Sequence, residues 1–183
     1  MAKGMKLLSV VFVFLTVIFA VLYGHLAKGV WLSLAITFGT FSYHFLMRLL
    51  VGGIVNAVMK NTADCDNPWF RVSEREARLY EKLGVKRWKG RMPTYDPALF
   101  DPKKRSWSEI AQATCQAEVV HENIVLLSFL PLLAAIPFDS FLVFLLTSLA
   151  AALFDAIFVI LQRYNRPRLL RLASRKQASK ETP

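Results

Sequence analysis

Apolar residues are gathered in four long blocks along this chain, and polar segments of very different lengths separate the blocks. The blocks predict membrane-spanning helices at about residues 7–24, 30–51, 120–137 and 141–161, because about 20 apolar residues of helix cross the hydrocarbon core of a bilayer. The apolar run 124–136 is short for a crossing, so we expect the polar residues before it to lie in the headgroup region or the protein core. The pattern predicts an all-α integral membrane protein with four transmembrane helices in a single domain, residues 1–183.

The longest polar segment, residues 60–107, separates the second predicted span from the third. It holds 12 Lys/Arg and 7 Asp/Glu together with three of the four tryptophans, and a disordered linker is poor in aromatic residues. Ser73 and Glu76 have the spacing of a helix-capping box, as do Ser106 and Glu109. We therefore expect a compact cap between helices 2 and 3, helical in part and irregular in part, which lies on the membrane surface.

The distribution of cations orients the predicted spans. With an even number of spans, the N-terminus, the cap and the C-terminal tail share one side and carry 2, 12 and 7 Lys/Arg, whereas the other side keeps only Lys28. Such a bias places the basic side in the cytoplasm. The net charge of +10 is thus explained by membrane orientation and anionic headgroups, and since no nucleic-acid docking motif is present we expect no nucleic-acid partner.

Two cysteines, Cys65 and Cys115, fall on the predicted cytoplasmic side. Thiols there stay reduced, so we expect no disulfide. The chain also has no paired Cys and His residues at zinc spacing, and we expect neither a metal site nor a cofactor. The sequence leaves the oligomeric state open.

The first candidate for chemistry is the polar stretch that precedes the third apolar block. Glu118 and His121 are three residues apart and share one face of a helix. Histidine is the side chain most easily used as a base near neutral pH, and a carboxylate in contact with it can fix its tautomer. The alternative is that these side chains only face water where the helix enters the membrane and have no chemical role.

A second candidate is an acid inside the last apolar block. Asp155, Gln162 and Arg166 have the spacing of one helical stripe, and we expect that stripe to face Glu118 and His121. Ionisable groups at such depth face a partner or a cavity. The structural alternative is that Asp155 pairs with His44 or Arg48, which are four residues apart on the second span, only to hold helices together.

The third candidate is the segment Gln162–Arg168, which contains Arg163, Tyr164, Asn165 and Arg166. Guanidinium groups suit phosphate or carboxylate, and membrane anchoring alone gives no reason for the amide and the phenol. We therefore expect a ligand-binding role for residues 162–166 and an anchoring role for the cations beyond them. Pro167 predicts that the helix is interrupted or re-aimed at Arg166.

At these residues the chain resembles the glycosyl-diaponeurosporenoate acyltransferases of carotenoid biosynthesis, which are small bacterial membrane proteins. The resemblance rests on Ala117-Glu118-x-x-His121, on the motif that begins at Gln162 and ends at Leu169, and more loosely on Val85–Lys89. The chain departs from the family pattern at Gln116, Asp155 and Ile157. The acceptor of this chain therefore need not be a carotenoid.

The resemblance implies a multi-pass protein of the bacterial cytoplasmic membrane that moves a fatty acyl group from acyl-CoA to a hydroxyl of a lipophilic or lipid-linked acceptor, which can be glycosylated. His121 would take the hydroxyl proton and Glu118 would orient His121. Arg163 and Arg166 would hold donor phosphates or the developing oxyanion. From the sequence pattern itself we also expect Gln162, Tyr164, Asn165, Asp155, His44 and Arg48 to bind substrate or donor, with Trp88 and Lys89 closing the site.

Two other functions fit the same residues. One is a different lipid-modifying enzyme, such as a methyl or prenyl transferase, whose arginines bind another anionic donor. The other is a non-catalytic lipid-binding or scaffold protein.

Overall fold

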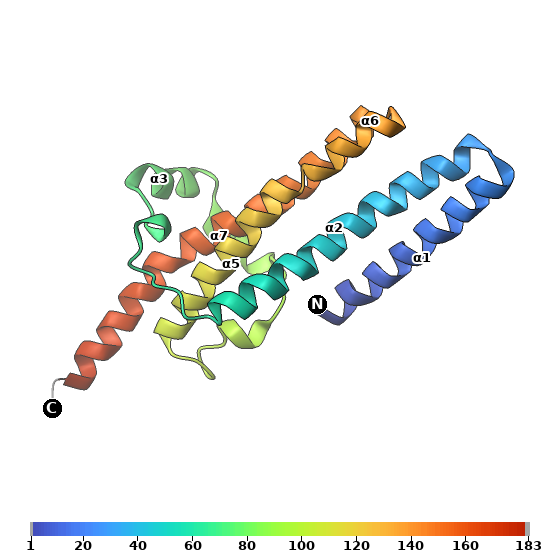
Figure 1. The fold of residues 1–183 in the computed structure, drawn as a ribbon. Helices are drawn as coiled ribbons and strands as arrows, with labels where there is room; N and C mark the ends of the chain where they lie inside the picture. The colour runs from blue at the N-terminus through green and yellow to red at the C-terminus, as the bar shows by residue number, and fades with distance from the viewer. Residues whose placement is uncertain (1, 182–183) are drawn as a thin grey trace. The chain divides into compact units, whose positions relative to one another are not determined.

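The computed structural model describes residues 2–181, and each regular element in that range is a helix (Figure 1). The long helices are α1 (Ala2–Leu26), α2 (Gly29–Met59), α5 (Trp107–Leu127) and α7 (Phe141–Glu181). The shorter elements are η1 (Pro68–Phe70), α3 (Glu74–Lys82), α4 (Val85–Trp88), η2 (Lys89–Arg91), η3 (Pro97–Phe100), η4 (Leu130–Ala134) and α6 (Ala135–Phe138).

Four stretches of helix in the described chain are long and apolar enough to cross a membrane. They are Lys3–Leu26, Gly29–Met59, Trp107–Phe138 and Phe141–Ser179. Their exposed surface is dominated by Leu, Val, Ile and Phe side chains, as expected of helices whose solvent is lipid. The predicted all-helical fold with four membrane-compatible helices is confirmed, and the chain is a multi-pass membrane protein.

Backbone contacts divide the chain into two compact units that are interleaved in sequence. The first, which we call the apolar unit, consists of the residues up to Gly52 together with Ile124–Phe154. The second, the polar unit, consists of Gly53–Asn123 together with the residues from Asp155 onward. The polar unit contains the whole predicted cap and most of the candidate site residues.

In the apolar unit, α1 and the first part of α2 form an antiparallel hairpin (Figure 1). Aromatic rings hold its two helices together: Phe19 stacks on Trp31 and Phe38 at 5.9 and 5.4 Å between ring centroids. The hydroxyls of Thr16 and Ser42 lie 3.2 Å apart across the same contact. Aromatic packing and interhelical hydrogen bonds replace the hydrophobic effect, which does not drive association between helices in lipid.

The third span is not the continuous helix that residues 120–137 predict. The α-helix α5 ends at Leu127 and is followed by the tighter turns of η4. The cause is Pro131, which has no N–H to donate to the carbonyl of Leu127, four residues earlier. Within the apolar unit the Tyr43 hydroxyl donates to that carbonyl at 2.7 Å, and so satisfies a group that lipid could not.

We expect Tyr43→Phe to lower the free energy of unfolding by about 1–2 kcal/mol, because it leaves the Leu127 carbonyl without its donor. Tyr23→Phe is the matched control, since that ring is 38% exposed on α1, and it should change stability by less than about 0.5 kcal/mol. Thermal unfolding of the purified protein in a neutral detergent measures both changes. Equal stability of the two variants would contradict the capping role of Tyr43.

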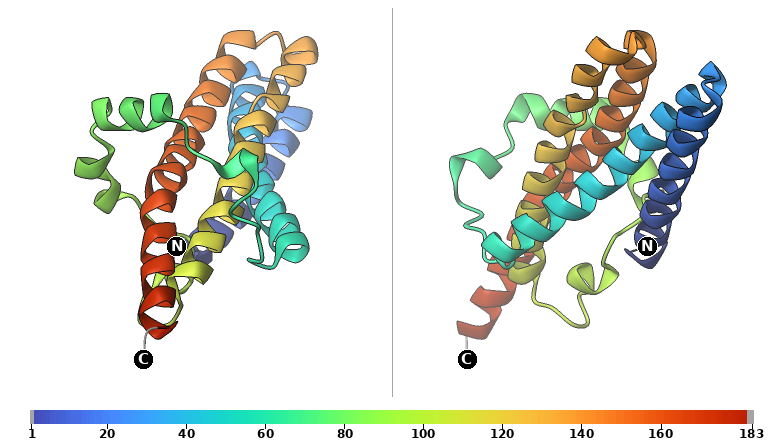
Figure 2. Two further views of the ribbon diagram at one scale, coloured as in Figure 1. Left: turned by 90° about the vertical axis from the view of Figure 1, so that its left-hand side faces the viewer. Right: turned by 45° about the vertical axis from the view of Figure 1, so that its right-hand side comes forward.

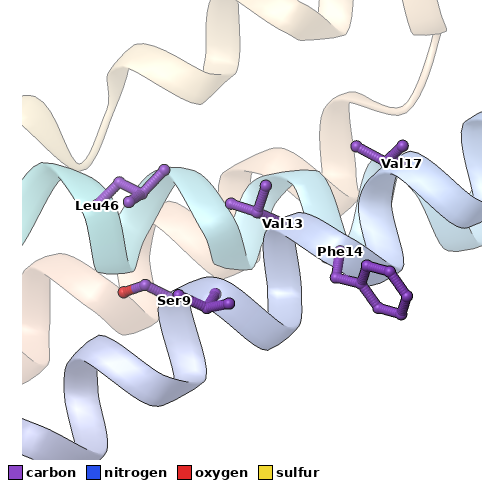
Figure 3. A pocket seen from close by; sticks show the side chains of 6 residues that line it. Ser9, Val13, Phe14, Val17 and Leu46 are labelled. Carbon is purple, nitrogen blue, oxygen red and sulfur yellow. The ribbon is translucent and has the colours of Figure 1, made fainter.

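The apolar unit also has two hollows on its surface. A shallow groove of about 380 Å³ is lined by Ser9, Val13, Phe14 and Val17 of α1 and by Leu46 of α2, among others (Figure 3). The Ser9 hydroxyl donates to the carbonyl of Met5 at 2.9 Å, so the groove offers lipid only hydrocarbon. The other cavity, of about 580 Å³, is lined by parts of α1, α2, η4, α6 and α7 and is also mostly apolar.

In the polar unit, the cap folds as its capping residues predict. Ser73 and Glu76 form a reciprocal capping box at the start of α3, and Gly84 follows that helix in the left-handed conformation with φ 62°, which glycine adopts at little cost. Ser106 and Glu109 make the same pair of hydrogen bonds at the start of α5. Figure 2 shows the cap in green beside the second half of α7.

The predicted interruption at Pro167 is wrong, because α7 continues through it to Glu181. A proline inside a helix removes one hydrogen bond, here to the carbonyl of Arg163, and costs about 3 kcal/mol. The side chains of Arg163 and Arg166 make eight hydrogen bonds or ion pairs with the rest of the polar unit. These contacts keep both residues on the helix and offset the cost of Pro167.

Candidate functional site

The centre of the polar unit is an ion-paired carboxylate between α5 and α7. Glu118 is fully buried. One of its oxygens accepts from Nη1 of Arg163 at 2.5 Å, and the other accepts from Nη2 of Arg166. Buried charges are stable only when paired and hydrogen-bonded, and this carboxylate has a guanidinium on each oxygen. The two polar clusters that are far apart in the sequence therefore meet, as the helical stripe predicts.

The two arginines also bind the first part of the cap. The carbonyls of Trp69 and Arg71 accept from Arg163 at 3.1 and 2.9 Å, and the carbonyl of Phe70 accepts from Arg166 at 2.8 Å. These are three successive residues at the end of the single turn η1. The guanidinium of Arg166 lies over the Phe70 ring, 4.9 Å from its centroid. The arginines thus fix the cap to α5 and α7.

Glu76 joins the cap to the same network from α3. Its Oε1 accepts from Nε of Arg163 at 2.9 Å. Burial by itself raises the pKa of Glu76, but hydrogen bonds from Ser73 and Arg163 outweigh burial, so that the pKa is lowered from its usual value. The carboxylate form is therefore the one that holds Arg163.

His121 and Asp155 form a second pair one helical turn away from the arginine network. Nδ1 of His121 lies 2.9 Å from Oδ1 of Asp155, which is 1% exposed. The imidazole stacks on the ring of Phe158, with centroids 4.7 Å apart and planes at 11°. A carboxylate oxygen accepts from Nδ1–H, so the lone pair of the neutral ring is on Nε2. This ring is held on one face and at one nitrogen, and its other nitrogen is the one that can act as a base.

The carboxylate beside His121 is thus that of Asp155 and not that of Glu118, which the sequence predicted as its orienting group. The two oxygens of Glu118 accept instead from the two arginines. Sequence spacing places Glu118 and His121 on one face of a helix, yet side chains that project from one helix often find their partners on another. Gln162, which is also buried, lies two turns after Asp155 on the same stripe.

The remaining predicted residues of the polar unit gather where the cap meets α7. Nζ of Lys89 donates to Oδ1 of Asn165 at 2.7 Å and lies 5.0 Å from the centroid of the Tyr164 ring. The indole nitrogen of Trp88 donates to the carbonyl of Leu83 at 3.1 Å. Lys89, Tyr164 and Asn165 are therefore brought together, whereas Trp88 holds the turn that follows α3.

His44 and Arg48 belong to the apolar unit. The Arg48 side chain donates to the carbonyl of His44 at 2.9 Å, and the His44 ring packs edge-on against Tyr43 with centroids 5.4 Å apart. Their part in the site stays a prediction.

The structure adds residues that sequence reasoning missed. Glu76 was recognised only as a capping residue, and Thr114 and Phe158 were not singled out. The thiols of Cys65 and Cys115 lie 3.1 Å apart, and both cysteines are free. The hydrogen bond with Cys115 is the main cause that lowers the pKa of Cys65. Spacing in the sequence contains no signal for these contacts, because each joins segments more than 30 residues apart.

A family model described as glycosyl-4,4'-diaponeurosporenoate acyltransferase matches residues 66–175, which is more than half of the chain. The matched range contains the cap from Asp66 onward, the pair His121–Asp155 and the network around Glu118. No curated protein and no solved structure matches the chain.

Proposed function

Because the chain belongs to the glycosyl-4,4'-diaponeurosporenoate acyltransferase family, we propose that it transfers a fatty acyl group from acyl-CoA to a hydroxyl of a lipophilic acceptor. The family name indicates acyl transfer to a glycosylated carotenoid acid. For this chain we propose the broader class, a lipid-linked or lipophilic molecule with a free, sugar-type hydroxyl. The reaction takes place in the bacterial cytoplasmic membrane, with both termini and the cap in the cytoplasm.

The observation that carries the proposal is the contact between His121 and Asp155. With Nδ1–H bonded to Asp155, Nε2 of His121 takes the proton of the acceptor hydroxyl as its oxygen attacks the thioester carbonyl. The C–S bond then breaks, and the leaving thiolate of CoA receives the proton from Nε2. The new ester and free CoA are the products, and the imidazole returns to its starting form. Asp155 stabilises the charged ring during transfer and keeps its orientation.

The network around Glu118 supports this chemistry by holding α5, α7 and the cap in register. The sequence suggested that Arg163 and Arg166 bind donor phosphates or an oxyanion. Their N–H groups are used by Glu118, Glu76 and the three successive carbonyls of the cap. We therefore assign these arginines to positioning. They fix the axial position of α5 relative to α7, and this position in turn allows the contact between His121 and Asp155.

The test is an acyl-transfer assay with the purified full-length protein in neutral detergent. Radiolabelled acyl-CoA is offered with a long-chain alkyl glucoside as acceptor, and the labelled ester is separated by thin-layer chromatography. We expect an ester that alkali cleaves, together with one equivalent of free thiol.

Parallel reactions contain a labelled methyl donor or a labelled prenyl diphosphate in place of acyl-CoA. Product from either of these donors and none from acyl-CoA would contradict acyl transfer and identify another class of lipid-modifying enzyme. Specific binding of the acceptor with no product from any donor would support the scaffold function instead.

A further inference from the structure

Three cationic residues and one asparagine lie where the cap meets the second half of α7, beyond the arginine network. We call Lys86, Lys89, Asn165 and Arg168 the basic cluster. Lys86 and Lys89 are three residues apart on the turn formed by α4 and η2, and Asn165 and Arg168 are three residues apart on α7. The hydrogen bond of 2.7 Å from Lys89 to Asn165 joins the two segments. The cluster is therefore built by two elements and fixed by a contact between them.

The charges in the basic cluster repel one another. Burial is the main cause that lowers the pKa of Lys89, and the nearby charges of Arg168 and Lys86 lower it further. Among the side chains that the structure describes, none of the three cations of the cluster has an ion pair with an acid. Arg163 and Arg166, only a few residues away, are by contrast fully paired. Like charges held together without an acid are favourable where an anion binds.

The donors of the cluster match a phosphate. Two ammonium groups and one guanidinium supply charge-assisted hydrogen bonds. Oδ1 of Asn165 accepts from Lys89, so its amide N–H groups are left as donors. The Tyr164 ring under Lys89, at 5.0 Å, limits the positions that the ammonium can take.

We propose that the basic cluster is a phosphate-binding site that holds the nucleotide end of acyl-CoA. This inference rests on the proposed function, since it names the binding site of the proposed donor. Asn165 is ten residues after Asp155 on α7, which places it about 15 Å further along the helix axis. The pantetheine arm of CoA is an extended chain that separates the thioester from the phosphates over a distance of that order. The arm thus joins the phosphate site to the reacting atoms at His121.

Anionic phospholipid headgroups carry the same phosphate chemistry, and the geometry favours CoA. Phosphatidylglycerol has a single phosphate attached directly to its glycerol, whereas CoA has a diphosphate and a 3′-phosphate for the three cations. A headgroup also gives no reason for the phosphate site to lie about 15 Å along α7 from Asp155, whereas the pantetheine arm does. The experiment must distinguish the two sources.

The test measures binding of CoA to the full-length protein in neutral detergent by isothermal titration. The background is His121→Ala, so that binding is scored without turnover and independently of the catalytic assignment. We expect Lys89→Gln and Arg168→Gln each to weaken CoA binding about 10- to 100-fold. Dephospho-CoA should bind more weakly than CoA, and the difference should shrink in the two variants.

Arg175→Gln is the matched control. It removes one cation from an exposed position on the same helix, about 10 Å beyond Arg168, and CoA affinity should stay within about twofold. Unchanged affinity for CoA in Lys89→Gln and Arg168→Gln would overturn the proposal. So would a loss of binding to vesicles that contain phosphatidylglycerol with CoA affinity unaltered, because the phosphate would then come from a headgroup. If CoA binds as expected but no acyl group is transferred, the proposed function fails and the phosphate site remains.

Discussion

His121→Ala should lower the rate of acyl transfer about 100- to 10,000-fold, which is the contribution of a well-placed general base. The protein should stay folded, because Glu118, Arg163 and Arg166 stay paired; the buried Asp155 loses one hydrogen bond, and thermal unfolding separates that loss of stability from the loss of rate. Asp155→Asn should have an effect of similar size. The amide can offer its N–H to Nδ1 and so favours the tautomer whose lone pair is on the wrong nitrogen. Initial rates with labelled acyl-CoA measure both effects.

The control for these two variants is Asn123→Ala. Asn123 is exposed on α5, two residues beyond His121, and its side chain donates only to the carbonyl of Val119 among the contacts described. Its rate should stay within about twofold of wild type. The effects on kcat and KM should differ, because loss of a base lowers kcat and leaves the KM for acyl-CoA nearly unchanged. A His121→Ala protein with wild-type kcat would remove His121 from the mechanism.

Glu118→Gln should lower the free energy of unfolding by about 3–5 kcal/mol, the largest stability effect we expect of any single substitution here. The carboxylate is fully buried, and Arg166 beneath it is 1% exposed. The amide keeps the shape but removes the negative charge, which leaves Arg166 without its counter-ion and Arg163 with Glu76 alone. Removing one partner of a buried ion pair has a cost of this size, because the remaining charge is uncompensated. Chemical or thermal unfolding in detergent measures the loss.

Glu122→Gln is the matched control for Glu118→Gln. It removes the same charge one turn further along α5, where the carboxylate accepts from the indole nitrogen of Trp69 at 3.0 Å. The amide oxygen can still accept that bond, so stability should change by less than about 1 kcal/mol.

A double substitution gives the sharper result. Glu118→Gln combined with Arg166→Gln should be no less stable than the worse of its parents, since the second change removes the charge that the first has stranded. Additive losses would show that the two side chains do not act as a pair.

How much of the site was predictable can be seen from Asp155. Its place within an apolar block predicts a buried partner, and its stripe with Gln162 and Arg166 predicts the face of α7 that meets α5. From the sequence, both His121 and the second span offered groups that could contact it. The structure shows Oδ1 of Asp155 at 2.9 Å from Nδ1 of His121, a contact that depends on the axial register of α5 and α7.

Pro131 and Pro167 show the same limit for the backbone. Both remove one helical hydrogen bond. At Pro131 the α-helix ends and Tyr43 satisfies the freed carbonyl, whereas at Pro167 the helix continues because its arginines are fixed on both sides. The proline in the local sequence predicts that a helical hydrogen bond is lost. Contacts with distant segments decide whether the helix ends or continues there.

The sequence by itself determined that this chain is helical and membrane-embedded, where α3 and α5 begin, and which polar residues are more than solvent-facing side chains. Hydrophobic block length, capping residues and the cost of burying charge are local properties, and each is readable within about 20 residues. The tertiary structure alone decided that Glu118 serves two arginines, that Asp155 serves His121, and that Lys89 meets Asn165. Those contacts depend on the axial positions of α5, α7 and the cap relative to one another. Many weak contacts between distant segments together determine these positions.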